Sequence, residues 1–189
     1  VTFASSVNAA GNQLAVAAGT GAVTATNAAN DFSNLAITAG SASIRDANTI
    51  ELGATNVTGN YSLRTAGAIT QNAGITVGGT ATLNAGAGNN ITLNNASNNF
   101  NAVAVTSGRD VSLVDANAMT INASSVRTIS ARTLSNDLTL GGNIVATGAG
   151  SGTSITLAAA QNFLNPGNRT LTPGAGSRWL VFSTNPAND

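Results

Sequence analysis

The chain contains neither Cys nor His among its 189 residues. This excludes disulfides, a thiolate nucleophile, a Ser–His–Asp triad and a zinc site of the usual Cys/His kind. Charged residues are scarce as well. The chain has seven acidic and seven basic residues, and every basic residue is Arg, so the formal net charge is zero. Such a balance lacks the basic surface that nucleic acids require and the polybasic patch that membranes attract. We therefore expect no nucleic-acid partner.

Long apolar runs are also missing. No run reaches the roughly 18 apolar residues of a transmembrane helix, so we expect no membrane insertion. The N-terminus has no basic segment followed by an apolar core, so no signal peptide is predicted. Val1 in place of Met suggests a fragment or a processed chain.

Five small or polar residue types dominate what is present. There are 35 Ala, 26 Asn, 25 Thr, 21 Gly and 17 Ser. Thr and the remaining apolar residues, mostly Val, Ile and Leu, favour strands, whereas Asn and Gly favour turns. Disorder is disfavoured, because the mean hydropathy is +0.15 and the net charge is zero. The composition predicts short strands separated by many turns.

Pairs of apolar residues that flank one small residue recur along the chain. They place both apolar side chains on one face of a strand. Examples are Ile75-Thr76-Val77, Ile91-Thr92-Leu93, Met119-Thr120-Ile121, Leu138-Thr139-Leu140 and Ile155-Thr156-Leu157. The spacing between such units is near 20 residues in Ile37, Val57 and Val77; Leu63 and Leu83; Leu93, Leu113 and Leu134; and Ile121 and Leu140.

This period predicts an all-β fold, a β-solenoid in which each coil buries its apolar face against the next. About nine coils, stacked about 4.8 Å apart, would make a rod about 40 Å long. A longer duplication is visible too. Residues 30–40 match residues 98–108, and Asp46-Ala47-Asn48 matches Asp115-Ala116-Asn117 one position further on. It indicates that about three coils were duplicated.

The composition changes near residue 161. All three Pro and the only Trp, Trp179, follow it. We interpret residues 1–160 as the parallel β-helix and residues 161–189 as a C-terminal closing coil, either a cap or a junction to a further module. Solenoids need such caps, which favours this role for Trp179 over ligand stacking.

The acidic residues are the candidate catalytic groups. They are Asp31, Asp46, Glu51, Asp110, Asp115, Asp137 and Asp189. A glycoside hydrolase needs two carboxyls about 5–10 Å apart, and Asp46 with Glu51, or Asp110 with Asp115, are the candidate pairs. The sparse pattern favours solvated turn residues. We expect no catalytic residues and no enzyme activity.

The sequence also contains few motifs that would bind a ligand. The Gly-rich Asp repeat that binds calcium is absent, and no cofactor or metal site is predicted. An arginine ladder for anionic glycans is one alternative, formed by Arg45, Arg64, Arg109, Arg127 and Arg132. Neighbouring acids, as in Arg45-Asp46 and Arg109-Asp110, favour turns that neutralise themselves instead.

The composition, the coils of about 20 residues and the phrase Thr106-Ser107-Gly108-Arg109-Asp110-Val111 resemble the filamentous-haemagglutinin-like adhesins. The tail from Gly176 to Pro186 is similar to segments that end their β-helices. These are exoproteins of Gram-negative bacteria that use two-partner secretion. The resemblance implies a right-handed parallel β-helix at the outer cell surface and a role in adhesion. The Asn-Pro-Asn-Leu type motif of the family's secretion domain is absent, so the chain is expected to be an internal or C-terminal piece.

The expected function is a stiff β-helical stalk in a secreted bacterial surface adhesin, mediating cell attachment or biofilm contacts. The implied partners are glycans or proteins of host or bacterial surfaces, with an outer-membrane transporter for the parent protein. Two alternatives stay open. One is a fibre subunit that associates head to tail through its coil ends. The other is a carbohydrate-binding or polysaccharide-degrading β-helix.

Overall fold

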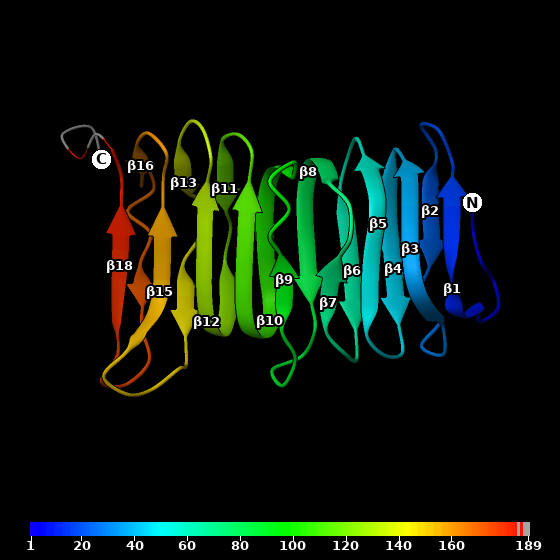
Figure 1. The fold of residues 1–189 in the computed structure, drawn as a ribbon, viewed down its shortest axis with the longest axis horizontal. Coiled ribbons are helices and arrows are strands. Elements are labelled where there is room, and N and C mark those ends of the chain that lie inside the picture. Colours follow the sequence, from blue (N-terminus) through cyan, green and yellow to red (C-terminus); the bar gives the residue numbers. More distant parts are fainter. Residues whose placement is uncertain (185, 187–189) are drawn as a thin grey trace.

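The computed structural model describes residues 1–184 and 186, which form one elongated stack of coils (Figure 1). Asn185 and Asp189, both in the predicted closing segment, lie outside the described residues. The described part of the chain holds eighteen β-strands and no α-helix. No helix in it has the length and apolar character needed to cross a lipid bilayer.

The strands are short and follow one another through turns rich in Asn and Gly. They are β1 Asn8–Ala17, β2 Ala22–Ala25, β3 Asp31–Ala39, β4 Ser41–Asp46, β5 Ile50–Val57, β6 Tyr61–Thr65, β7 Ile69–Gln71, β8 Ile75–Asn84 and β9 Ile91–Leu93. The second half contains β10 Asn99–Asp115, β11 Met119–Ile121, β12 Ser124–Thr133, β13 Leu138–Leu140, β14 Ile144–Ala146, β15 Thr153–Ala158, β16 Phe163–Leu164, β17 Leu171–Thr172 and β18 Arg178–Phe182.

Strands pair in parallel with the strand one coil away, as a solenoid requires. β2 pairs with β4, β4 with β6, and β6 with the second half of β8. In Figure 1 the nearer strands run upward, the fainter strands behind run downward, and the chain advances to the left. The coil is therefore right-handed. The predicted parallel β-helix of about nine coils is confirmed.

An aliphatic ladder runs through the core along the axis of the rod. Ile50, Ile69, Ile91, Val111, Ile129 and Ile155 stack in register, one from each successive coil. All six side chains are buried. Full burial of an aliphatic side chain of this size contributes about 1.5–3 kcal/mol, so each added coil extends and stabilises the same core.

A second ladder shows how Ala makes room for a large ring in the core. Tyr61 is buried in the column formed by Val23, Ala42, Tyr61, Ala81, Val103, Ile121 and Leu140. Ala42 and Ala81 are its neighbours on the two flanking coils. Two methyl groups leave room for one large ring, so the narrow interior keeps a nearly constant filling along the axis.

Most of the predicted spacings correspond to true register. Leu63 pairs with Leu83, and Leu93 pairs with Leu113. Two are wrong. Ile37 pairs with Thr55, and Val57 pairs with Ala39, because this coil is shorter than the predicted period: Leu35 already pairs with Leu52. Leu113 pairs with Ala131, and Leu134 lies just beyond β12 with 43% of its surface exposed.

The segment after residue 160 forms one more coil of the same stack. β16, β17 and β18 pair in parallel with β13, β14 and β15. Trp179 pairs with Ile155 and so continues the aliphatic ladder, but 49% of its surface is exposed. Whether this coil serves as a cap or as a junction stays a prediction.

Candidate functional site

Two buried corners of the coil carry matching polar networks. Asn30 is buried at the turn before β3, where its amide Nδ2 donates to the carbonyls of Ala25 (2.9 Å) and Arg45 (3.1 Å). Asp46 is buried at the end of β4. Its carboxylate accepts the backbone N–H of Phe32 at 2.7 Å and that of Asn48 at 3.1 Å. Together these two side chains satisfy backbone groups from two adjacent coils.

The same arrangement recurs in the second half of the chain. Asn98 donates to the carbonyls of Leu93 and Val114, each at 3.1 Å. Asp115 accepts the N–H of Phe100 at 2.6 Å and that of Asn117 at 2.8 Å. The duplication visible in the sequence is therefore a duplication of a structural network.

Both aspartates differ from their predicted role as solvated turn residues. Asp46 and Asp115 are buried, with 2% and 0% of their surfaces exposed. Burial raises the pKa of Asp115, and the hydrogen bonds from Phe100 and Asn117 partly offset the effect. Burial likewise raises the pKa of Asp46, and the nearby Asp31 adds to the rise, against the hydrogen bonds it accepts from the backbone. The prediction failed because Asp in an Asn-rich turn looks exposed, yet its carboxylate turns inward to bind backbone amides.

In each of the two candidate acid pairs, one carboxyl is buried and therefore not accessible to a substrate. Asp46 is buried on β4, whereas Glu51 lies on the outer face of β5. One Glu51 oxygen accepts the amides of Asn34 and Asn72, each at 2.8 Å. Asp110 is partly exposed on β10, while Asp115 is buried at the end of that strand. Neither pair has the geometry of a glycosidase site, in which both carboxyls face one sugar.

The remaining acids serve as acceptors for side-chain amides. Asp31 accepts the amide of Asn48 at 3.0 Å, and Asp137 accepts the amide of Asn162 at 2.8 Å. The described residues include no group of three His, Cys, Asp or Glu side chains suited to hold a metal ion. Asp189 lies outside the described residues.

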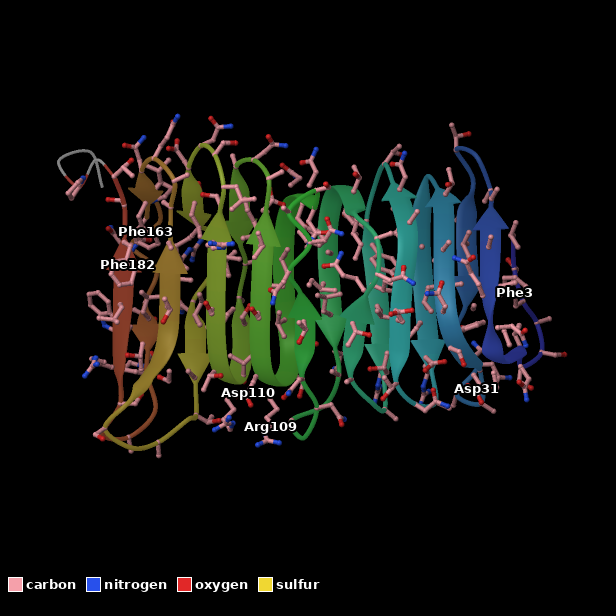
Figure 2. The ribbon with its side chains drawn as sticks, viewed as in Figure 1. Phe3, Asp31, Arg109, Asp110, Phe163 and Phe182 are labelled. Atoms are coloured by element: carbon pink, nitrogen blue, oxygen red, sulfur yellow. The ribbon has the colours of Figure 1, made fainter. Side chains whose placement is uncertain are left out.

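The predicted pair of Arg109 and Asp110 forms, and Arg127 joins it. Arg109 Nε lies 3.4 Å from Asp110 Oδ2, and Arg127 donates to Asp110 Oδ1. Figure 2 shows Arg109 and Asp110 along one edge of the rod, near its middle. Partial desolvation opposes ionisation of Asp110, but hydrogen bonds from Arg127 and Thr128 and the charges of Arg127 and Arg109 lower its pKa.

The other predicted pair, Arg45 with Asp46, does not form. Asp46 turns its carboxylate toward the backbone of Phe32 and Asn48, whereas Arg45 lies on the outer face of β4. In the parallel ladder Arg45 lies directly beside Arg64 of β6, and Arg64 lies beside Asn84 of β8. No ion pair involves Arg45 or Arg64 within the described structure. Successive residues of a β-strand point to opposite faces of the sheet, so the side chains of Arg45 and Asp46 point away from each other.

A groove of about 320 Å³ lies at these two arginines and crosses the turns of successive coils. We call it the arginine groove. Its lining consists of Ala28, Arg45, Asp46, Ala47, Arg64, Thr65, Ala66, Asn84, Ala85, Gly86 and Asn89. Small residues recur at the same place in each coil, so the long side chains stand beside a shallow channel.

The two ends of the rod form a different kind of surface. Apolar residues that pack against the core but stay partly exposed lie in the first coil, as Phe3 and Leu14 do, and in the last, as Phe163, Leu171 and Val181 do. Figure 2 shows Phe3 at one end of the rod and Phe163 and Phe182 at the other. A cavity of about 500 Å³ at the last coil is lined by these C-terminal apolar residues together with Trp179 and Arg169.

Comparison with known proteins adds one match. Residues 39–107 match a family model described as repeats of unknown function, DUF5649. The match covers just over a third of the chain and runs from the end of β3 into β10. No curated protein and no solved structure matches the chain. The matched segment is 69 residues long, which is close to the 68-residue offset between Asn30 and Asn98. The matched segment is thus similar in length to the duplicated unit seen in this chain.

Proposed function

We propose that this chain is a stiff β-helical stalk segment of a secreted bacterial surface adhesin, which supports cell attachment or biofilm contacts. The observation that carries the proposal is the single core that runs through every coil, from Val16 in the first coils to Ala159 near the last. A rod held by parallel strand pairing at every step resists bending, because each coil is bound to its neighbours over several strands.

The outer surface supports the same proposal. Outward positions on the strands are mostly Thr, Ser and Asn, as in Ser41, Ser43 and Ser62 along the β4–β6 ladder. Such a surface is hydrated and nearly uncharged, which suits a spacer that must not adhere along its length. The match to a repeat family is in keeping with a segment that extends by repetition.

Attachment of the producing bacterium tests the proposal. The coding region for residues 1–184 is deleted in frame from the parent gene, and a control strain carries Arg132→Gln, an exposed change on the side of the rod. Antibodies raised against the folded chain should label intact wild-type cells, and the deletion should reduce attached cells at least tenfold. Unlabelled intact cells, or full attachment after deletion, would contradict the stalk role.

A second candidate function is head-to-tail assembly into a fibre, and the apolar ends of the rod favour it. In the part of the chain that the structure describes, β1 pairs along one edge with β3 and β18 along one edge with β15, and unpaired edges invite pairing with another chain. In this arrangement the last coil of one copy stacks on the first coil of the next.

The only Trp reports on this assembly directly. Trp179 lies in the last coil and is half exposed, so stacking would bury it and shift its fluorescence to shorter wavelength as concentration rises. Phe3→Asp at the opposite end should abolish the shift, whereas Leu134→Asp on the side of the rod should leave it. Sedimentation that shows monomers alone at high concentration, with no spectral shift, would exclude the fibre.

A further inference from the structure

The geometry points to an anion-binding site in the arginine groove, one that takes the acidic group of an oligosaccharide between Arg45 and Arg64. This inference goes beyond the stalk function and does not depend on it. It starts from the ladder that places Arg45 beside Arg64 and Arg64 beside Asn84 on three successive coils.

Two like charges stand one strand spacing apart in this ladder. Neighbouring strands lie about 4.8 Å apart, and like charges directly opposite each other destabilise a sheet. Elsewhere on the rod, Arg109 and Arg127 share the carboxylate of Asp110 and so avoid this repulsion. Arg45 and Arg64 have no such partner in the described structure. An oxyanion between them would replace repulsion by two attractive contacts.

Among the described residues, no acid forms an ion pair with Arg45 or Arg64. Asp46 is the one acidic residue that lines the groove, and its carboxylate oxygens are occupied by the N–H groups of Phe32 and Asn48. Glu51 lies on the next strand, where its carboxylate binds Asn34 and Asn72. The guanidinium groups therefore remain available to a ligand.

The chemistry of the lining selects the ligand class. Guanidinium groups bind carboxylate, sulfate or phosphate oxygens through paired hydrogen bonds. The amide oxygen of Asn84 accepts the Gly86 N–H at 3.1 Å, which leaves its amide hydrogens for a ligand. Asn84 therefore supplies an amide suited to a sugar hydroxyl beside the charged pair.

Nucleic acid fits the groove less well. Binding of single-stranded nucleic acid depends on many phosphate contacts and on aromatic side chains that stack with bases. The groove has two arginines and no aromatic residue in its lining. Its volume of about 320 Å³ suits one or two sugar rings carrying an acidic group.

Titration of the folded chain with defined oligosaccharides tests the site. Trigalacturonate supplies carboxylates, a trisaccharide sulfate supplies sulfates, maltotriose is the neutral control, and a short single-stranded DNA is the polyanion control. Amide chemical shifts or calorimetry measure the dissociation constant at low salt. We expect binding of at least one acidic sugar, no binding of maltotriose, and weaker binding of the DNA.

Three single variants test whether the acidic sugar binds at Arg45 and Arg64. Arg45→Gln and Arg64→Gln should each weaken acidic-sugar binding at least tenfold. Arg132→Gln removes an outward arginine that pairs in register with Val114 and Ala158, so it should leave binding unchanged. All three changes lie on the outer surface, and circular dichroism verifies that each variant is folded.

The source of the oxyanion is read from which sugar binds more tightly, the carboxylate or the sulfate. Tighter binding of DNA than of both acidic sugars would overturn the inference. Equal loss in all three variants would overturn it as well, because it would indicate general attraction to positive charge. No binding of either acidic sugar would exclude the site, and would leave the attachment test of the stalk unaffected.

Discussion

Asn98 makes the same backbone hydrogen bonds as Asn30, which precedes it by 68 positions. Each donates to the carbonyl of a residue five positions earlier, and to the carbonyl of the residue just before a buried aspartate. The backbone carbonyl of each asparagine in turn accepts an N–H from the residue after that aspartate, Ala47 or Ala116. The buried asparagine and aspartate thus close one corner of the coil, and the chain uses this corner twice.

Replacing Asn98 by Ala should lower the free energy of unfolding by about 3 kcal/mol or more, because several buried backbone groups lose their partners. Asn98 also exchanges hydrogen bonds with Gln71, at 2.8 and 2.9 Å. In the described structure the side chain of Asn30 bonds to backbone groups alone, so Asn30→Ala should destabilise the chain less. Urea denaturation of both variants measures the difference. Equal losses would show that the Gln71 contact contributes nothing.

Asp115→Asn should change how stability depends on pH. The folded state raises the pKa of Asp115 above its ordinary value of 3.8, so the folded state holds its proton more tightly than the unfolded state does. The contribution of this group to stability is then largest below pH 3.8, and it declines as the pH rises through the raised value. Asn does not titrate at this position.

The stability advantage of wild type over Asp115→Asn should therefore shrink as the pH rises from 3.8 toward neutrality. Chemical denaturation across this range measures it. Asp46 is present in both proteins, so its own titration cancels in the comparison. An advantage that grows with pH would mean that the hydrogen bonds from Phe100 and Asn117 outweigh burial.

Tyr61→Phe should stabilise the chain. The ring of Tyr61 is buried between Ala42 and Ala81, and its hydroxyl has no hydrogen-bond partner among the described residues. Removing a buried, unsatisfied hydroxyl while keeping the ring should raise the free energy of unfolding by about 1 kcal/mol. Tyr61→Ala is the matched control and should cost about 3–5 kcal/mol, since it leaves a cavity in the column. A loss of stability in Tyr61→Phe would show that the hydroxyl is satisfied by water.

Gly40→Ala should destabilise the rod where two coils meet closely. A Cβ at Gly40 would lie 2.0 Å from the carbonyl oxygen of Thr20 in the preceding coil. Relief of this clash requires the backbone to move, at a cost of about 2 kcal/mol or more. Gly88→Ala is the control: a Cβ there meets no atom within 4 Å. Thermal denaturation should show a lower melting temperature for Gly40→Ala alone, and equal melting temperatures would contradict the close approach.

The candidate site was only partly predictable. The arginines were identified from the sequence, but their pairing was not, because Arg45 and Asp46 are adjacent in sequence and point to opposite faces of β4. The partner of Arg45 is Arg64, 19 residues away and one coil further on. The structural importance of Asn30 and Asn98 was also missed. The repeated Asn, Phe and Asp-Ala-Asn pattern signalled it, yet burial of an amide cannot be read from a turn sequence.

The sequence by itself determined the class of fold. Alternating apolar residues with a period near 20, punctuated by Asn and Gly, permit a stable core only when coils stack in parallel. The tertiary structure decided the register at each step. The shift between Leu35 and Ile37 brings Thr55 beside Ile37, so the offset between paired residues changes within one coil. It also decided which charges meet, since contacts across coils depend on register that no single strand encodes.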